Sequence, residues 1–139
     1  MSKAIKLDNN VYLDSSSIVH NKTKLSDILD YSLNERKIGT WIDGKPLFRK
    51  VIKHTINGTT ANVDIGLSDV SIVKAEFYIT KGLTAFDANT YRWESTVSNL
   101  NCYIANGILT FKSYSQDRTG YDLIAIIEYT KTTDQENNE

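Results

Sequence analysis

The sequence predicts a mainly β protein in which short N-terminal strands and one short helix precede an antiparallel β-sandwich with a jelly-roll-like arrangement. Three observations predict this fold class: apolar residues alternate with polar ones, tight-turn dipeptides separate the runs, and helical periodicity is confined to one segment. Regular short strands without intervening helices are typical of a sandwich. We expect residues 1–38 to form the strands and helix, residues 39–131 the head domain, and residues 132–139 a disordered or loosely attached tail.

The N-terminal region consists of three short extended pieces, AIKL, VYL and SIVHN. Turn-forming clusters at residues 8–10 and 14–17 separate them. Each piece is too short and too polar to hold a sheet alone. We therefore expect strands from neighbouring chains to supply the missing partners.

The helical segment runs from Lys24 to about Arg36-Lys37, with Gly39 as a plausible stop. A helix of about three turns is marginal alone and needs a cover for its apolar face. That cover is either the following domain of the same chain or the same helix from other copies. The second alternative makes the residues at helical spacing candidates for an interface between copies: Leu25, Ile28, Leu29 and Leu33.

The head begins with a predicted hairpin, in which Thr40–Ile42 and Leu47–Ile52 flank the turn residues 43–46. Asn57-Gly58 and Asn106-Gly107 predict two further tight turns. Half-buried antiparallel strands are predicted where apolar residues alternate with polar ones, at Ala61, Val63 and Ile65 and again at Val73, Ala75, Phe77 and Ile79.

The run Tyr121–Tyr129 differs from the other predicted strands because it is apolar on both faces. Leu123, Ala125 and Ile127 share one face, while Ile124 and Ile126 share the other. The second face must meet either another layer of its own domain or another subunit. Ile124 and Ile126 are therefore further candidates for an interface between copies.

Catalytic and metal-binding motifs are absent from the sequence, so we expect neither an enzyme, a metal site nor a cofactor. The single cysteine, Cys102, is expected to be a small buried hydrophobe, the alternative being a nucleophile activated by His20 or His54. A net charge of -1 does not favour nucleic-acid binding, and no run reaches membrane-spanning length. The N-terminus resembles no signal peptide, so we expect synthesis in a cytoplasm and no membrane insertion.

One predicted loop carries residues suited to recognition: Tyr114, Gln116, Asp117, Arg118 and Tyr121. Aromatic rings hold the C–H faces of sugars, and planar polar groups bind their hydroxyls. The alternative is that both tyrosines pin strand ends. Asp117 and Asp122 could also form the carboxylate pair of a glycosidase.

Two phrases give the chain a family resemblance. IKLDNNVYLDSSSIVHNKTKLSDIL followed by IGTWIDGKPLFRKVI resembles the terminal modules of phage and prophage structural proteins, namely tail-fibre, baseplate or receptor-binding proteins, and LIAIIEYTK resembles the last strand of their head domain. This resemblance implies a homotrimer in the virion, with intertwined strands and a helical neck below a β-sandwich head.

The resemblance also implies partners. Three weak sites on one tip would bind host cell-surface polysaccharide multivalently, and the N-terminus would join other virion proteins. The alternative is a purely structural fibre, baseplate or capsid-decoration protein whose head contacts virion proteins. The chain length fits a small fibre, a tip joined to another protein, or a fragment.

Overall fold

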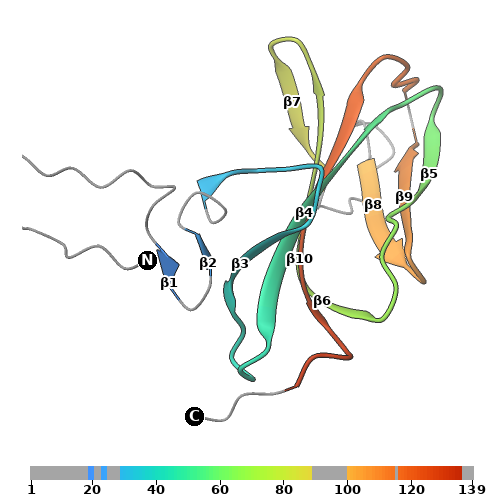
Figure 1. The fold of residues 1–139 in the computed structure, drawn as a ribbon. Helices are drawn as coiled ribbons and strands as arrows, with labels where there is room; N and C mark the ends of the chain where they lie inside the picture. The colour runs from blue at the N-terminus through green and yellow to red at the C-terminus, as the bar shows by residue number, and fades with distance from the viewer. Residues whose placement is uncertain (1–18, 21–22, 25–28, 89–99, 115, 136–139) are drawn as a thin grey trace, which may run out of the picture.

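The protein is built from antiparallel strands in two facing sheets (Figure 1). The structure is a computed structural model that describes residues 19–20, 23–24, 29–88, 100–114 and 116–135. A mainly β chain with two antiparallel sheets was predicted, and the described residues confirm that part of the prediction.

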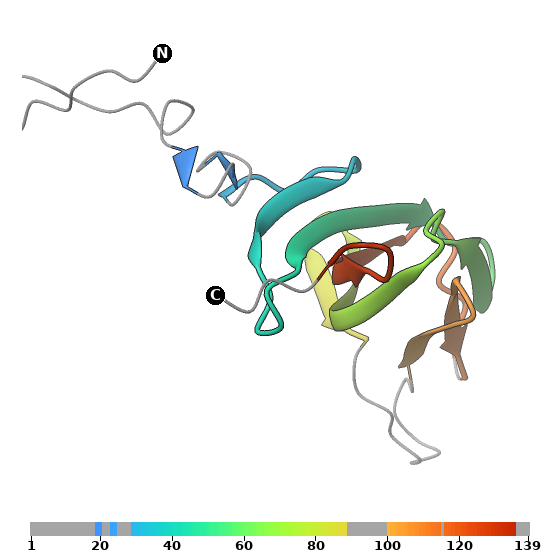
Figure 2. The same ribbon diagram turned by 60° about the horizontal axis from the view of Figure 1, so that its bottom comes forward.

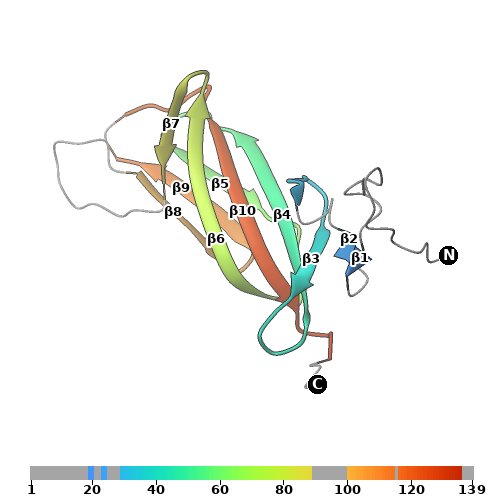
Figure 3. The ribbon, with the colours of Figure 1, turned by 90° about the vertical axis from the view of Figure 1, so that its left-hand side faces the viewer.

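The larger sheet has five strands and contains the centre of the molecule. In spatial order its strands are β3 (Arg36–Thr40), β4 (Pro46–Thr55), β10 (Asp122–Lys131), β6 (Val70–Lys81) and β7 (Thr84–Asp87). The smaller sheet has the order β5 (Thr60–Asp64), β9 (Ile108–Ser113) and β8 (Leu100–Ala105). Figures 2 and 3 show the smaller sheet lying against one face of the larger one.

The chain crosses between the sheets four times, and these crossings produce the sandwich. It leaves the five-stranded sheet after β4 and after β7, and it returns to it at β6 and at β10. The last strand, β10, then pairs with β4 on one side and β6 on the other. A strand that is last in sequence therefore lies at the centre of the sheet.

The inner face of β10 supplies the middle of the core. Leu123, Ala125, Ile127 and Tyr129 are fully buried, which confirms the predicted apolar face. On the neighbouring strand Phe77 and Ile79 are buried as well, and the smaller sheet contributes Leu109 and Phe111 from β9. Side chains from both sheets thus meet in one hydrophobic core, as in other aligned sandwiches.

Two of the three predicted turns join paired strands, whereas Asn57-Gly58 lies in the connection from β4 to β5, strands of different sheets. Asn106 and Gly107 have positive φ values of 51° and 77°, and they join β8 to β9 as a two-residue hairpin. The β3–β4 hairpin closes around Gly44, whose amide donates to the carbonyl of Trp41 over 2.9 Å. Trp41 and Ile42 lie in this turn, although the sequence predicted them to lie in a strand.

The predicted helix does not extend to Arg36-Lys37. Residues 30–35 are not helical, and β3 begins at Arg36, inside the segment predicted to be the helix end. Leu33 therefore lies at a bend, and Leu29 and Leu33 are about 60% exposed, at 61% and 60%. Leu25 and Ile28 lie outside the described residues.

Hydrogen bonds to the sheet explain why residues 30–35 are not helical. The Val51 amide donates to the Ser32 carbonyl, and the Tyr129 hydroxyl donates to the Glu35 carboxylate, which also pairs with Lys131 Nζ at 2.7 Å. A helix would remove these contacts, so tertiary bonding overrides the helical periodicity.

The two ends of the described chain differ in their hydrogen bonding to the rest of the protein. Near the N-terminus, β1 (Val19–His20) and β2 (Thr23–Lys24) pair only with each other, and they lie on the β3 side of the large sheet (Figure 3). Near the C-terminus, both the amide and the hydroxyl of Thr132 donate to the Asp69 carbonyl. The predicted loose tail is therefore attached at its first residue.

Candidate functional site

The loop between β9 and β10, called the end loop below (residues 114–121, of which residue 115 is not described), is fastened to the β4–β5 connection. The Arg118 amide donates to the Gly58 carbonyl and the Gly120 amide to the Ile56 carbonyl, both at 2.9 Å. In return, the Ile56 amide donates to the Tyr121 carbonyl at 2.7 Å. These bonds anchor the backbone of residues 118–121, although none of the described residues of the end loop belongs to a strand.

Three of the five predicted recognition residues project from the end loop into solvent. Tyr114 is 57% exposed, and Gln116 and Asp117 are exposed too. The carboxylate of Asp117 accepts hydrogen bonds from the Thr119 hydroxyl and amide, which lower the pKa of Asp117. These exposed side chains are available to a ligand.

The other two predicted residues face inward. Arg118 is only 3% exposed, and its guanidinium lies 4.9 Å from the centre of the Phe86 ring and 5.3 Å from that of Tyr121. Tyr121 is half-buried, with its ring centre 6.4 Å from that of Phe86. For Tyr121 this packing agrees with the alternative reading, in which the tyrosine pins a strand end.

Lys81 and Phe86 complete this cluster, and neither was predicted from the sequence pattern. Lys81 Nζ lies 5.5 Å from the centre of the Tyr121 ring. Lys81 ends β6 and Phe86 lies in β7, so both are more than 30 residues away from Arg118 and Tyr121 in sequence. Only the position of β10 beside β6 brings them together.

The two carboxylates considered for glycoside hydrolysis have separate partners. Asp122 accepts from the Thr55 hydroxyl at 3.1 Å and lies 3.6 Å from Lys53 Nζ, whereas Asp117 is held by Thr119. A general acid in a glycosidase needs a raised pKa, and the pKa of Asp117 is lowered. This environment does not support the acid role for Asp117.

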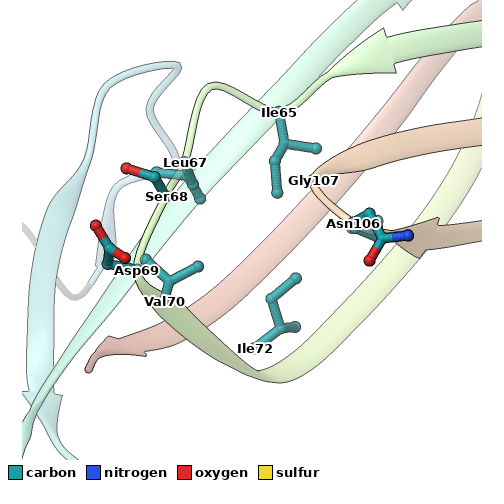
Figure 4. Close-up of a pocket in the computed structure, with 9 residues that line it drawn as sticks. Ile65, Leu67, Ser68, Asp69, Val70, Ile72, Asn106 and Gly107 are labelled. Atoms are coloured by element: carbon teal, nitrogen blue, oxygen red, sulfur yellow. The ribbon is translucent and has the colours of Figure 1, made fainter.

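A cavity of about 500 Å³ lies at the opposite end of the sandwich, between the β5–β6 connection and the β8–β9 turn. Figure 4 shows its lining, which is aliphatic apart from Ser68, Asp69 and the Asn106-Gly107 turn. The aliphatic lining residues are Ile65, Leu67, Val70, Ile72 and Ile104. The lining contains neither an aromatic ring nor a cation, groups that commonly hold a sugar.

The outer face of the large sheet carries the remaining interface candidates. Ile124 and Ile126 are half-buried there, and Ile126 pairs with Val51 on β4. On the same face, Lys53 pairs with Asp122 and Lys74 with Glu76. The outer face is therefore an apolar strip bordered by ion pairs.

Cys102 is buried, as expected, and burial raises the pKa of its thiol to about 12. A thiol with this pKa is almost fully protonated at neutral pH, which does not favour a nucleophilic role. His54 is exposed on β4, and His20, the other histidine considered for activation of Cys102, has no described side chain.

In the part of the chain that the structure describes, no three His, Cys, Asp or Glu side chains gather as they would around a metal ion. The same residues include no helix with the length and apolar character to cross a membrane.

Comparisons with known protein families, with curated proteins and with solved structures found no match.

Proposed function

We propose that the chain is the head and neck of a phage fibre or tail tip that binds glycans on the host cell surface through the end loop, several copies acting together. The observation that carries the proposal is the anchoring of residues 118–121 to the β4–β5 connection, next to exposed Tyr114, Gln116 and Asp117. The resemblance of residues 5–29 and 38–52 to phage structural proteins supports the same function.

Multivalency strengthens weak sites in this proposal. A site of a few exposed polar side chains binds a sugar weakly, and linked copies raise the effective concentration of the sites for one another. The outer face of the large sheet, with Ile124 and Ile126, is the surface we propose for contact between copies. Leu29 and Leu33 extend it, because their exposed segment is bonded to β4 through Ser32 and Val51.

The trimeric stalk and the jelly-roll-like head remain parts of the proposal. The chain alternates between sheets at β4, β5 and β6, and β10 inserts between β4 and β6, which is the pattern that supports a jelly-roll-like head. β6 and β7 instead form a hairpin within one sheet.

Binding to bacterial cell walls and to a glycan array tests the recognition role. We expect Tyr114→Ala to reduce binding at least tenfold, because the exposed ring offers its face to a sugar and packs little within the chain. Tyr103→Ala is the matched control, since Tyr103 is 41% exposed on β8 and lies outside the end loop. Equal binding by the two variants would contradict the assignment of the end loop.

The aliphatic cavity favours a second candidate function, that of a structural virion protein. A cavity lined by five aliphatic side chains fits an apolar side chain of another virion protein. Ile104→Asp would place a charge in its wall, and the structural role predicts loss of the chain from assembled particles with unchanged cell-wall binding. For Tyr114→Ala the recognition role predicts loss of cell-wall binding with unchanged incorporation into particles.

A further inference from the structure

We infer that the cluster of Lys81, Phe86, Arg118 and Tyr121 is a binding site for an anionic group, a carboxylate or a phosphate carried by a glycan. This inference rests on the proposed function and specifies its ligand class. The cluster adjoins the exposed residues of the end loop, so one saccharide could contact both.

The first support is that the Arg118 side chain is buried and lacks a hydrogen-bond partner at Nε. Its side chain is 3% exposed, and its Nε atom is enclosed without a hydrogen-bond partner. Buried guanidinium groups are normally paired with a carboxylate or fully hydrogen-bonded, because removing the charge from water is costly. Within the described chain the guanidinium instead lies against two aromatic rings, those of Phe86 and Tyr121.

The second support is a second cation at the same ring. Lys81 Nζ lies 5.5 Å from the centre of the Tyr121 ring, and Arg118 Cζ lies 5.3 Å from it. Both cations thus lie within 5.5 Å of one ring centre, and among the described residues no ion pair joins either of them to a carboxylate. A bound anion would supply this counter-charge.

The carboxylates closest in sequence are engaged elsewhere. Asp117 accepts from Thr119, and Asp122 interacts with Thr55 and Lys53. Asp87, next to Phe86 in β7, is exposed and lies opposite Tyr78 in the β6–β7 register. Asp117 and Asp122 therefore do not neutralise the positive charge of the cluster.

The local backbone keeps Lys81 at the cluster. Gly120 has φ of +86°, and a Cβ atom built there would lie 3.4 Å from Lys81 Nζ. The absence of a side chain at this position leaves room for the ammonium beside Tyr121. A planar guanidinium, an ammonium and a ring are the groups that bind a carboxylate or phosphate together with an attached sugar.

The alternative is that Arg118 only closes the end of the core by stacking on two rings. Substitution of Lys81 distinguishes anion binding from this structural role, because the Lys81 side chain is exposed and its removal should not affect the core. Lys74→Gln is the matched control: it removes the same charge from the same strand, where Lys74 instead pairs with Glu76 at 2.9 Å.

The test is an NMR titration of the full chain with inorganic phosphate, glucuronate and neutral glucose at low salt. We expect phosphate or glucuronate, and not glucose alone, to shift the amide signals of Lys81, Arg118 and Tyr121. Lys81→Gln should weaken this binding about fivefold to tenfold, and added salt should weaken it in the wild type. Lys74→Gln should bind as the wild type does.

Absence of anion-dependent shifts, or equal shifts in Lys81→Gln and the wild type, would overturn the anion site. If the wild type binds cell walls and Lys81→Gln binds them equally well, the anion site fails and the recognition role stands. If phosphate binds at the cluster and no glycan or cell wall binds the wild type, the recognition role fails and the anion site stands.

Discussion

At the scale of the residue, Ile126 and Ile127 show how one strand serves two surfaces. They are adjacent in β10, yet Ile127 is fully buried in the core and Ile126 lies half-buried on the outer face of the sheet. The alternation of side chains along a strand produces this difference. Identical side chains at neighbouring positions should therefore have different energetic roles.

Truncating each isoleucine tests this difference. We expect Ile127→Ala to lower the free energy of unfolding by about 2–5 kcal/mol, because it leaves a cavity in the core. Ile126→Ala should cost about 1 kcal/mol or less within a single chain. Urea unfolding at one fixed protein concentration measures both, and equal losses would show that the outer face is packed like the core.

Gly107 is a position where backbone conformation decides the effect of a substitution. Its φ is +77°, and the nearest atom to an added Cβ would be the Leu67 carbonyl oxygen at 3.9 Å. Gly107→Ala should therefore destabilise the β8–β9 hairpin by about 1 kcal/mol through backbone strain, without a clash. Asn106→Gly, at the preceding turn position, is the control and should be close to neutral in thermal unfolding.

At the scale of the element, the segment before β3 shows why part of the fold could not be predicted from sequence. Strands with strict alternation, such as Ala61 to Ile65, were predictable because local pattern and burial agree. Leu29 and Leu33 have helical spacing, but the Ser32 and Glu35 bonds to distant strands decide the conformation. Sequence spacing contains no information about partners 19 and 94 residues away.

In the candidate site, too, some features could be predicted from the sequence and others could not. The exposed residues of the end loop could be chosen from their chemistry, because they are contiguous in the sequence. The burial of Arg118 and the position of Lys81 beside Tyr121 depend on the strand order, in which β10 lies next to β6. A residue type suited to ligand contact was therefore predictable, and its orientation was not.

The Glu35 contacts give a testable pH dependence. Burial opposes ionisation of Glu35, but hydrogen bonds from Lys131 and Tyr129 outweigh it and lower the pKa of Glu35 below 4.5. A lowered pKa in the folded state stabilises the fold above the unfolded pKa, and this stabilisation is lost as the pH falls through the folded value.

We expect Glu35→Gln to lower the free energy of unfolding by about 1 kcal/mol at pH 7, because a charge-assisted contact with Lys131 is lost. The difference from the wild type should shrink as the pH falls below about 4.5, where Glu35 becomes protonated in the unfolded chain, and should vanish as the pH falls through the lower folded pKa. Unfolding curves at pH 7 and pH 3 measure it. A difference that stays constant over this range would show that the ion pair contributes nothing.

At the scale of the whole molecule, apolar surface remains after the described chain has folded. The inner face of β10 is fully covered, whereas Ile124 and Ile126 on its outer face are partly exposed, together with Leu29 and Leu33 beside β4. We propose that identical copies cover this surface, which would also place several end loops on one particle.

Ile126→Lys should disrupt the contact between copies without removing any side chain from the core. The lysine would lie between Val51 and Glu76 on the outer face, so the fold should remain intact while association is lost. Circular dichroism checks the fold, and light scattering checks the mass. An unchanged assembly mass would exclude the outer face as the interface.

The mass of the wild-type chain in solution tests the proposal of bundled copies most directly. Sedimentation equilibrium at micromolar concentration and neutral pH should give three times the chain mass of 15.7 kDa. A folded particle with the mass of a single chain would contradict the account.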